Sequence, residues 1–292
     1  MQWDAVLHCL TATSLGPPRR RDRPEQGCTG AYRHSYYHFV PYSFPLHTPT
    51  TMFSKLKDMI RGDKHSELDM DREYALEQLM KYDTQFLIDD SGSMAGSRWI
   101  EARDALMGIA KEALQHDADG IEVYFLNAEQ KGKTVRSQDD VKELFDSVRP
   151  SSGTPTGERL EQILTAYIIK LEGAKAFGQT PKASGIKPLN LIVITDGEPS
   201  DDPEGVIITA ARRLDVGQFP LAQVGIQFIQ VGDDSQASKA LEKLDDHLGK
   251  KHDVRDIVDT RPYTGRKLTS DLLIAMLLGG INKRVDKAKN VD

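Results

Sequence analysis

The stretch LNLIVITDG (residues 189–197) joins a nearly unbroken apolar run to a carboxylate and a glycine. Such a run predicts a strand of a parallel sheet that is covered on both faces. Asp196 and Gly197 follow directly, so the strand is expected to end on them. In open α/β sheets, binding sites lie beyond the carboxyl ends of the strands, which makes Asp196 a candidate site residue.

Strands and helices alternate on both sides of this run. Further strands are expected at 85–88, 121–127, 224–232 and 255–260, with a short edge strand near Thr134 and Val135. Helices are expected at 97–116, 137–148, 160–171, from Asp202, at 235–248 and at 270–286, with a surface connection at 173–187. The β-α order predicts an α/β fold with a doubly wound, mostly parallel sheet and helices on both faces.

Composition divides the chain into four segments. Residues 83–282 carry the alternation and are expected to form a single domain. Residues 52–82 are expected to be a helical lead-in, and residues 283–292 a basic tail. Residues 1–51 are rich in Pro, Arg, Tyr and His without a helical or strand period, which predicts either a disordered extension or a stretch upstream of a true start at Met52.

Charge and cysteine usage exclude several classes of protein. The net charge is −6, with acidic and basic residues mixed along the chain, so no general attraction to nucleic acid or anionic membranes is expected. No apolar run approaches the roughly 18 residues that span a bilayer. The only cysteines are Cys9 and Cys28, so residues 83–282 hold neither a disulfide nor a Cys-ligated zinc. These features predict an intracellular, cytoplasmic protein.

Oxygen-bearing side chains follow two strands and precede one helix. They are Asp89, Ser91 and Ser93 after the strand 85–88, Thr154 in the loop SSGTPTG, and Asp196. Because these positions meet at one edge of a parallel sheet, we expect the side chains to lie close together. Carboxylate and hydroxyl oxygens suit Mg²⁺ or Mn²⁺, and no Cys or His is present to favour zinc. Only two carboxylates contribute, so such a cation could accept a further carboxylate from another molecule.

The same residues resemble the metal-ion-dependent adhesion site of von Willebrand factor type A domains. The resemblance covers roughly residues 83–282, and VGIQFIQVGDD and RDIVDTRPY are similar to its intracellular branch, including the copine type. It rests on three motifs: Asp89-x-Ser91-x-Ser93, Gly153-Thr154-Pro155-Thr156-Gly157 and Thr195-Asp196-Gly197.

The resemblance implies a role for each matching residue. Ser91, Ser93 and Thr154 would bind the metal through hydroxyl oxygens, and Asp89 and Asp196 would bind it directly or through water. The supporting loop residues would be Gly92, Gly153, Thr156 and Gly197. An Asp or Glu of a partner protein would complete the coordination, which implies a metal-dependent interaction module and no enzyme.

Other interpretations of the same residues remain open. Ser91 and Ser93 could cap the following helix, and Asp196 could cap a turn. The fold could serve as a metal-independent scaffold. A Mg²⁺-dependent phosphohydrolase is a third alternative, but such enzymes need a second Asp where this chain has Ser91.

The sequence also leads to two predictions about the other carboxylates near the site. Asp90 occupies a variable position and is expected to be solvated. Three more acidic residues are expected to add negative charge beside the site, which would favour a cation and oppose an acidic partner: Glu198, Asp201 and Asp202.

Overall fold

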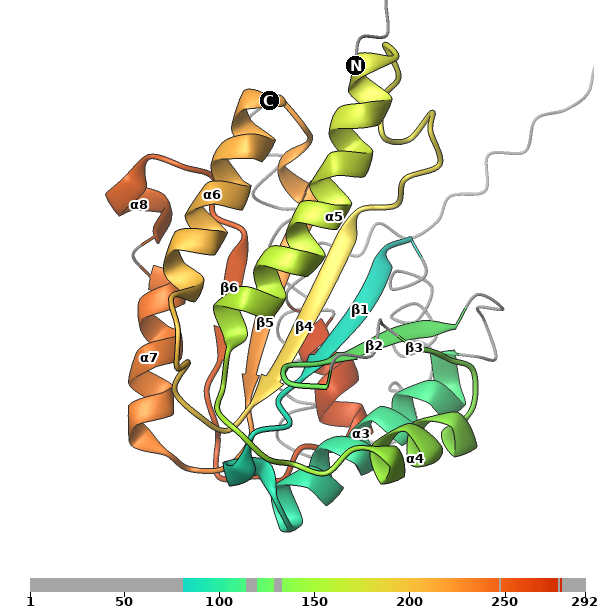
Figure 1. Cartoon of the computed structure of the whole chain (residues 1–292), viewed down its shortest axis with the longest axis vertical. Helices are drawn as coiled ribbons and strands as arrows, with labels where there is room; N and C mark the ends of the chain where they lie inside the picture. Colours follow the sequence, from blue (N-terminus) through green and yellow to red (C-terminus); the bar gives the residue numbers. More distant parts are fainter. Residues whose placement is uncertain (1–80, 114–119, 129–132, 247, 278, 280–292) are drawn as a thin grey trace, which may run out of the picture. The chain divides into compact units, whose positions relative to one another are not determined.

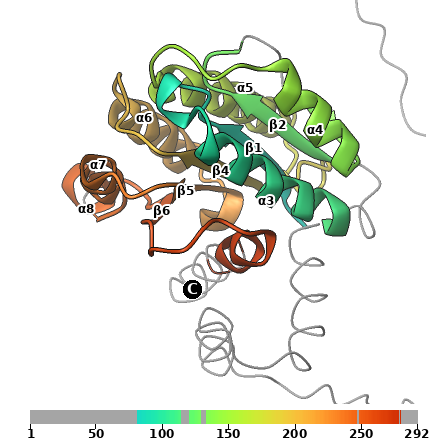
Figure 2. The ribbon, with the colours of Figure 1, turned by 90° about the horizontal axis from the view of Figure 1, so that it is seen from below.

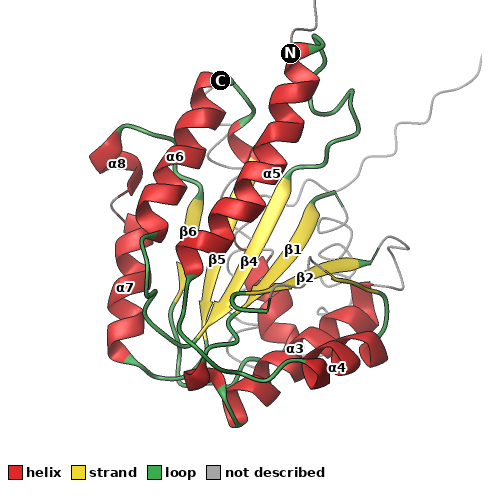
Figure 3. Cartoon of the chain, in the orientation of Figure 1, coloured by secondary structure: helices red, strands yellow, loops and turns green. Residues whose placement is uncertain are grey.

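A six-stranded sheet forms the centre of the computed structural model, which describes residues 81–113, 120–128, 133–246, 248–277 and 279. The strand order is β3-β2-β1-β4-β5-β6 (Figure 1, Figure 3). All neighbours pair in parallel except β2 and β3, which pair antiparallel at one edge. The predicted α/β class with a mostly parallel sheet is therefore confirmed. The strands are β1 (Asp83–Ile88), β2 (Ile121–Phe125), β3 (Lys133–Val135), β4 (Leu189–Thr195), β5 (Val224–Gln230) and β6 (Val258–Arg261).

Helices cover both faces of this sheet (Figure 2). One face packs against α3 (Ser97–Ala113), α4 (Gln138–Ser147) and the helical residues 270–277. The other face packs against α5 (Thr156–Ala176), α6 (Pro203–Val216) and α7 (Ser235–Asp246). Three short helical segments complete the described elements: η1 (Gly92–Met94), η2 (Leu221–Gln223) and α8 (Leu248–His252).

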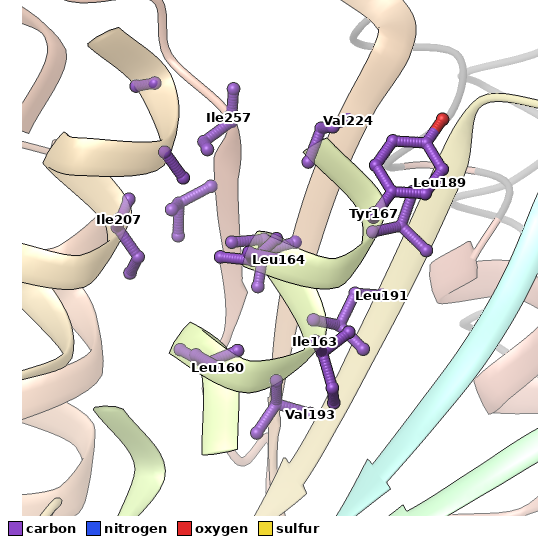
Figure 4. Close-up of a cluster of buried hydrophobic side chains, with 14 of the residues drawn as sticks. Leu160, Ile163, Leu164, Tyr167, Leu189, Leu191, Val193, Ile207, Val224 and Ile257 are labelled. Carbon is purple, nitrogen blue, oxygen red and sulfur yellow. The ribbon is translucent and has the colours of Figure 1, made fainter. Parts of the chain in front are cut away.

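Alternation along β4 divides the core between the two faces. Leu191 and Val193 belong to the cluster beneath α5, whereas Ile192 and Ile194 belong to the cluster beneath α3. Figure 4 shows the first cluster, with side chains of α5 directed onto β4. Every residue of β4 is buried, because successive side chains point to opposite faces and both faces are covered.

The boundaries of several elements differ from the sequence expectations. β1 begins two residues earlier, because Asp83 pairs with Leu189 of β4. β2 ends at Phe125, two residues earlier than expected. The expected surface connection at 173–187 is wrong at its start, since α5 continues to Ala176. The expectations for residues 1–51, for nearly all of 52–82 and for 283–292 concern parts of the chain outside the described residues.

Two expected helix starts are confirmed by their caps. The Ser137 hydroxyl accepts a hydrogen bond from the Asp140 N–H at 3.0 Å, at the start of α4. The Asp202 carboxylate accepts one from the Gly205 N–H at 3.1 Å, at the start of α6. In both cases a side-chain oxygen satisfies a backbone donor that has no partner within the helix.

Gly108 is a point of close approach between α3 and the helical residues 270–277. A Cβ on Gly108 would lie 2.3 Å from the Cβ of Ser270, a distance that the two helices cannot accept without moving apart. By contrast, a Cβ added to Gly173, in α5, would have no atom within 4 Å.

We expect Gly108→Ala to lower the free energy of unfolding by about 1–3 kcal/mol through overpacking. The matched change Gly173→Ala should raise it by up to about 1 kcal/mol through helix propensity. Urea denaturation of both variants measures the difference. Equal gains in stability from the two changes would show that no close helix contact exists at Gly108.

Candidate functional site

Three loops meet at the carboxyl end of the central strands. They are the loop after β1, the loop after β4 and the loop that leads into α5 (Figure 1). Backbone hydrogen bonds join them: the Gly92 N–H donates to the Ser152 carbonyl at 3.2 Å, and the Ser200 N–H donates to the Thr154 carbonyl at 2.9 Å. Segments that are about forty-five to sixty residues apart in sequence are therefore held together here.

Hydroxyl and carboxylate oxygens form a connected group on this edge. The hydroxyls of Ser91 and Ser93 lie 3.0 Å apart, and the Ser93 hydroxyl donates to Asp196 Oδ1 at 2.8 Å. Adjacent ligands of an octahedral Mg²⁺ lie about 3 Å apart, since each oxygen is about 2.1 Å from the ion. The spacing and the chemistry of these three side chains therefore fit a hard divalent cation.

Asp89 lies beneath this group and is fully buried. Its Oδ1 accepts from the Ser91 N–H at 2.8 Å, and its Oδ2 accepts from the Thr195 hydroxyl at 2.6 Å. Burial raises the pKa of the Asp89 carboxyl, the hydrogen bonds from Thr195 and Ser91 oppose this, and the nearby charge of Asp196 raises the pKa further. Both oxygens of Asp89 are thus already engaged within the protein, and an added cation would relieve the cost of burying its charge.

Thr154 approaches the group from the loop before α5. Its hydroxyl lies 3.7 Å from the position that a Cβ would take on Gly197, and the Ser93 hydroxyl lies 3.8 Å from the same point. Thr156 is buried, and its N–H donates to the Thr154 carbonyl at 2.8 Å. The Thr154 hydroxyl and the Ser93 hydroxyl therefore lie on the same side of Gly197, while Thr156 fixes the backbone of the loop.

The expectation that Asp90 is solvated is wrong. The residue is only 2% exposed, and its carboxylate accepts from Asn127 and Ala128. The distances are 2.7 Å from the Asn127 N–H, 3.0 Å from its side-chain amide and 3.0 Å from the Ala128 N–H. The same amide donates to the Gly153 carbonyl at 2.9 Å, so Asp90 holds Asn127 against the Thr154 loop. The sequence does contain a sign that Asp90 has a partner: Asn127 is a polar residue at the end of the adjacent predicted strand.

The acidic residues after β4 have structural partners as well. Asp201 accepts from the N–H groups of Gly157 and Glu158, both at 2.8 Å, and so caps the N-terminus of α5 from a distant segment. Asp202 caps α6. A helix N-terminus carries partial positive charge, which offsets part of the negative charge of each carboxylate. These two side chains therefore oppose an acidic partner less than sequence reasoning assumed.

Arg98 is a site residue that sequence reasoning missed. Its guanidinium lies 2.5 Å from Asp196 Oδ2 and 3.3 Å from the Ser93 carbonyl. Arg98 is in the first turn of α3, where the helix macrodipole disfavours a cation. A basic residue at that position was the available signal, because it indicates a compensating anion nearby.

The candidate set contains no His or Cys, and carboxylates are a minority of its five residues. Among the described residues, no group of three or more His, Cys, Asp or Glu side chains could hold a metal ion. The candidate set contains two carboxylates, Asp89 and Asp196, and its other oxygens are hydroxyls. Cation binding at this edge would therefore depend on Ser91, Ser93 and Thr154.

A doubly wound, mostly parallel sheet with helices on both faces defines a Rossmann-like α/β fold. A sequence profile of the von Willebrand factor type A domain matches residues 83–261, and the chain therefore belongs to this family of protein-interaction domains. No curated protein matches the chain. Within the part of the chain that the structure describes, no helix has the length and apolarity to cross a membrane.

The match ends before the helical residues 270–277. Leu268, Leu273, Ile274 and Leu277 nevertheless belong to the core cluster between the sheet and α3. This packing makes residues 268–277 part of the same hydrophobic core as the matched region.

Proposed function

We propose that this domain binds Mg²⁺ or Mn²⁺ at the carboxyl edge of its sheet and captures an acidic group of a partner protein through that cation. The observation that carries the proposal is the chain of short oxygen distances from Ser91 through Ser93 to Asp196, between loops distant in sequence. When bound, the cation would supply positive charge and a coordination position for a partner carboxylate.

The ligand set follows from the contacts of each side chain. Ser91, Ser93 and Thr154 would contribute hydroxyl oxygens, and Asp196 would contribute a carboxylate oxygen. Asp89 accepts two hydrogen bonds within the protein, so we assign it an indirect role through water. Its charge stabilises a nearby cation, and its bond to the Ser91 N–H orients the loop that carries both serines.

The loop glycines and Thr156 would act in support. The Gly92 N–H is tied to Ser152, and the Gly153 carbonyl is held by Asn127. Gly197 lies beside the Thr154 and Ser93 hydroxyls, which a Cβ at this position would touch at ordinary contact distances of 3.7 and 3.8 Å.

We also propose that the protein is cytoplasmic and that its role is binding and not catalysis. The absence of cysteine from residues 29–292 supports the first part. The second part is supported by Ser91, which stands where a phosphohydrolase of the haloacid-dehalogenase type requires a carboxylate.

A metal-independent scaffold is the second candidate function. It is favoured by the ion pair of Arg98 with Asp196, which supplies positive charge at the site from the chain itself. Partner capture that persists in EDTA and in Asp196→Ala would identify a scaffold, whereas capture that requires Mg²⁺ would identify the metal-dependent module.

Calorimetric titration of the full chain with Mg²⁺ and Mn²⁺ tests the proposed site. We expect Ser93→Ala to weaken cation binding by at least about tenfold, because the change removes an oxygen ligand. Ser93 is exposed, so the domain should remain folded. Ser151→Ala is the matched control, since Ser151 is an exposed serine of the adjoining loop and lies outside the ligand set. Equal affinity in Ser93→Ala and wild type would refute the assignment of this residue.

A further inference from the structure

Arg98 sits in a position fixed by three separate segments. Its guanidinium contacts Asp196 after β4 and the Ser93 carbonyl in η1. It also lies over Gly232, after β5, where an added Cβ would come within 2.7 Å of Arg98 Nε. Gly232 has a φ of +80°, a conformation that favours glycine, and its lack of a side chain leaves room for the guanidinium.

The two members of the ion pair differ in burial. The Asp196 side chain is 0% exposed, whereas the Arg98 side chain is 34% exposed. A buried carboxylate without a compensating charge is strongly destabilising, so Asp196 needs a cation nearby. Arg98 can supply this charge and still move into solvent, because a third of its side chain already faces water.

A divalent cation and the guanidinium would compete for the same carboxylate. Two cations within a few Å of each other repel even at the dielectric of water, and Asp196 is the group that both would contact. We infer that Arg98 is a built-in competitor of the metal, so that metal binding is an exchange in which the ion replaces the guanidinium on Asp196. This inference rests on the proposed metal site and adds its regulation.

The exchange has two consequences. Arg98 lowers the apparent affinity of the site for the cation, because each binding event must break the ion pair. Arg98 also maintains the stability of the domain at low cation concentration, because Asp196 keeps a counter-charge. Removal of Arg98 should therefore tighten metal binding and make folding more dependent on the metal.

Calorimetric titration of the full chain with Mg²⁺ and Mn²⁺ measures the first consequence. We expect Arg98→Gln to bind either ion about tenfold more tightly than wild type, since a neighbouring positive charge is lost. The matched control is Arg103→Gln, which removes the same charge from the same helix, where Arg103 pairs with its neighbour Asp104 at 2.8 Å. This control should retain the wild-type affinity.

Gly232→Ala provides a second variant that keeps the charge of Arg98. Its methyl group would lie 2.7 Å from Arg98 Nε, too close for the present position of that side chain, and would push Arg98 from Asp196. We expect tighter cation binding than in wild type here also, and circular dichroism checks that the variant is folded.

Thermal unfolding in EDTA and in Mg²⁺ measures the second consequence. Arg98→Gln should unfold at a lower temperature than wild type in EDTA, and added Mg²⁺ should raise its unfolding temperature by more than that of wild type. Unchanged or weaker cation binding in Arg98→Gln, with wild type binding normally, would overturn the exchange and leave the metal site intact. Absence of cation binding in wild type, in Arg98→Gln and in Gly232→Ala would overturn the metal site and the exchange together.

Discussion

Replacing Asp89 by asparagine should abolish detectable Mg²⁺ binding, with a loss of affinity of about a hundredfold or more. Asp89 is one of only two carboxylates in the ligand set, and the charge of the donor groups sets the affinity for a hard cation. Calorimetric titration with Mg²⁺ and Mn²⁺ gives the affinity directly.

The same change should leave the fold intact. The amide oxygen of the introduced asparagine could still accept the hydrogen bond that the Ser91 N–H donates at 2.8 Å. Burial raises the pKa of Asp89, which means that the folded protein disfavours its charge, so a neutral side chain of the same size is tolerated. We expect the free energy of unfolding in EDTA to stay within about 1 kcal/mol of wild type.

Asp104→Asn is the matched control for this prediction. Asp104 lies on α3, its side chain is 58% exposed, and its replacement removes the same charge at a distance from the site. Wild-type metal affinity in Asp89→Asn would show that Asp89 serves only to hold the loop, and the metal proposal would then lose one of its two carboxylates.

Replacing Asp90 by alanine should lower the free energy of unfolding by about 2–4 kcal/mol. The carboxylate accepts three hydrogen bonds, from the backbone and side chain of Asn127 and from the Ala128 N–H. Their loss removes the side-chain link beyond the ends of β1 and β2, which then remain joined only by backbone contacts such as the bond from the Leu126 N–H to the Ile88 carbonyl. Because Asn127 also holds the Gly153 carbonyl, we expect cation binding to weaken as the Thr154 loop loses its support.

Urea denaturation measures this change in stability. Asp104→Ala should alter the free energy of unfolding by no more than about 0.5 kcal/mol, because its carboxylate is exposed. Asp90→Asn should fall between the two, since its amide oxygen can accept some of the three hydrogen bonds. An Asp90→Ala variant as stable as Asp104→Ala would show that this buried carboxylate does not hold the two strands together.

The strands were predictable wherever the local pattern was strong. The apolar run at 189–195 corresponds to β4, and the run beginning at Val224 corresponds to β5. Both lie in the middle of the sheet, where burial on two faces leaves no charged residue in either strand. The boundaries were less accurate, because pairing with a neighbour decides them: β1 extends back to Asp83 opposite Leu189.

The candidate site was predictable as a set of positions. Asp89, Ser91, Ser93, Thr154 and Asp196 follow strands or precede a helix, and a parallel sheet brings such positions to one edge. The contacts at that edge were not predictable to the same degree. Asp90 was expected to be solvated and Asp201 to add negative charge beside the site. In the structure both accept hydrogen bonds from backbone N–H groups of segments about forty residues away.

The α/β class, the family and the positions of the oxygen-bearing side chains could be predicted from the amino-acid sequence, because they depend on periodicity and on short motifs. The pairing of Arg98 with Asp196, and the close contact that Gly108 permits with Ser270, became visible only in the folded chain. These features depend on groups that lie about one hundred residues or more apart in the chain. Their distances are set by how the helices pack on the sheet, and no local pattern encodes that packing.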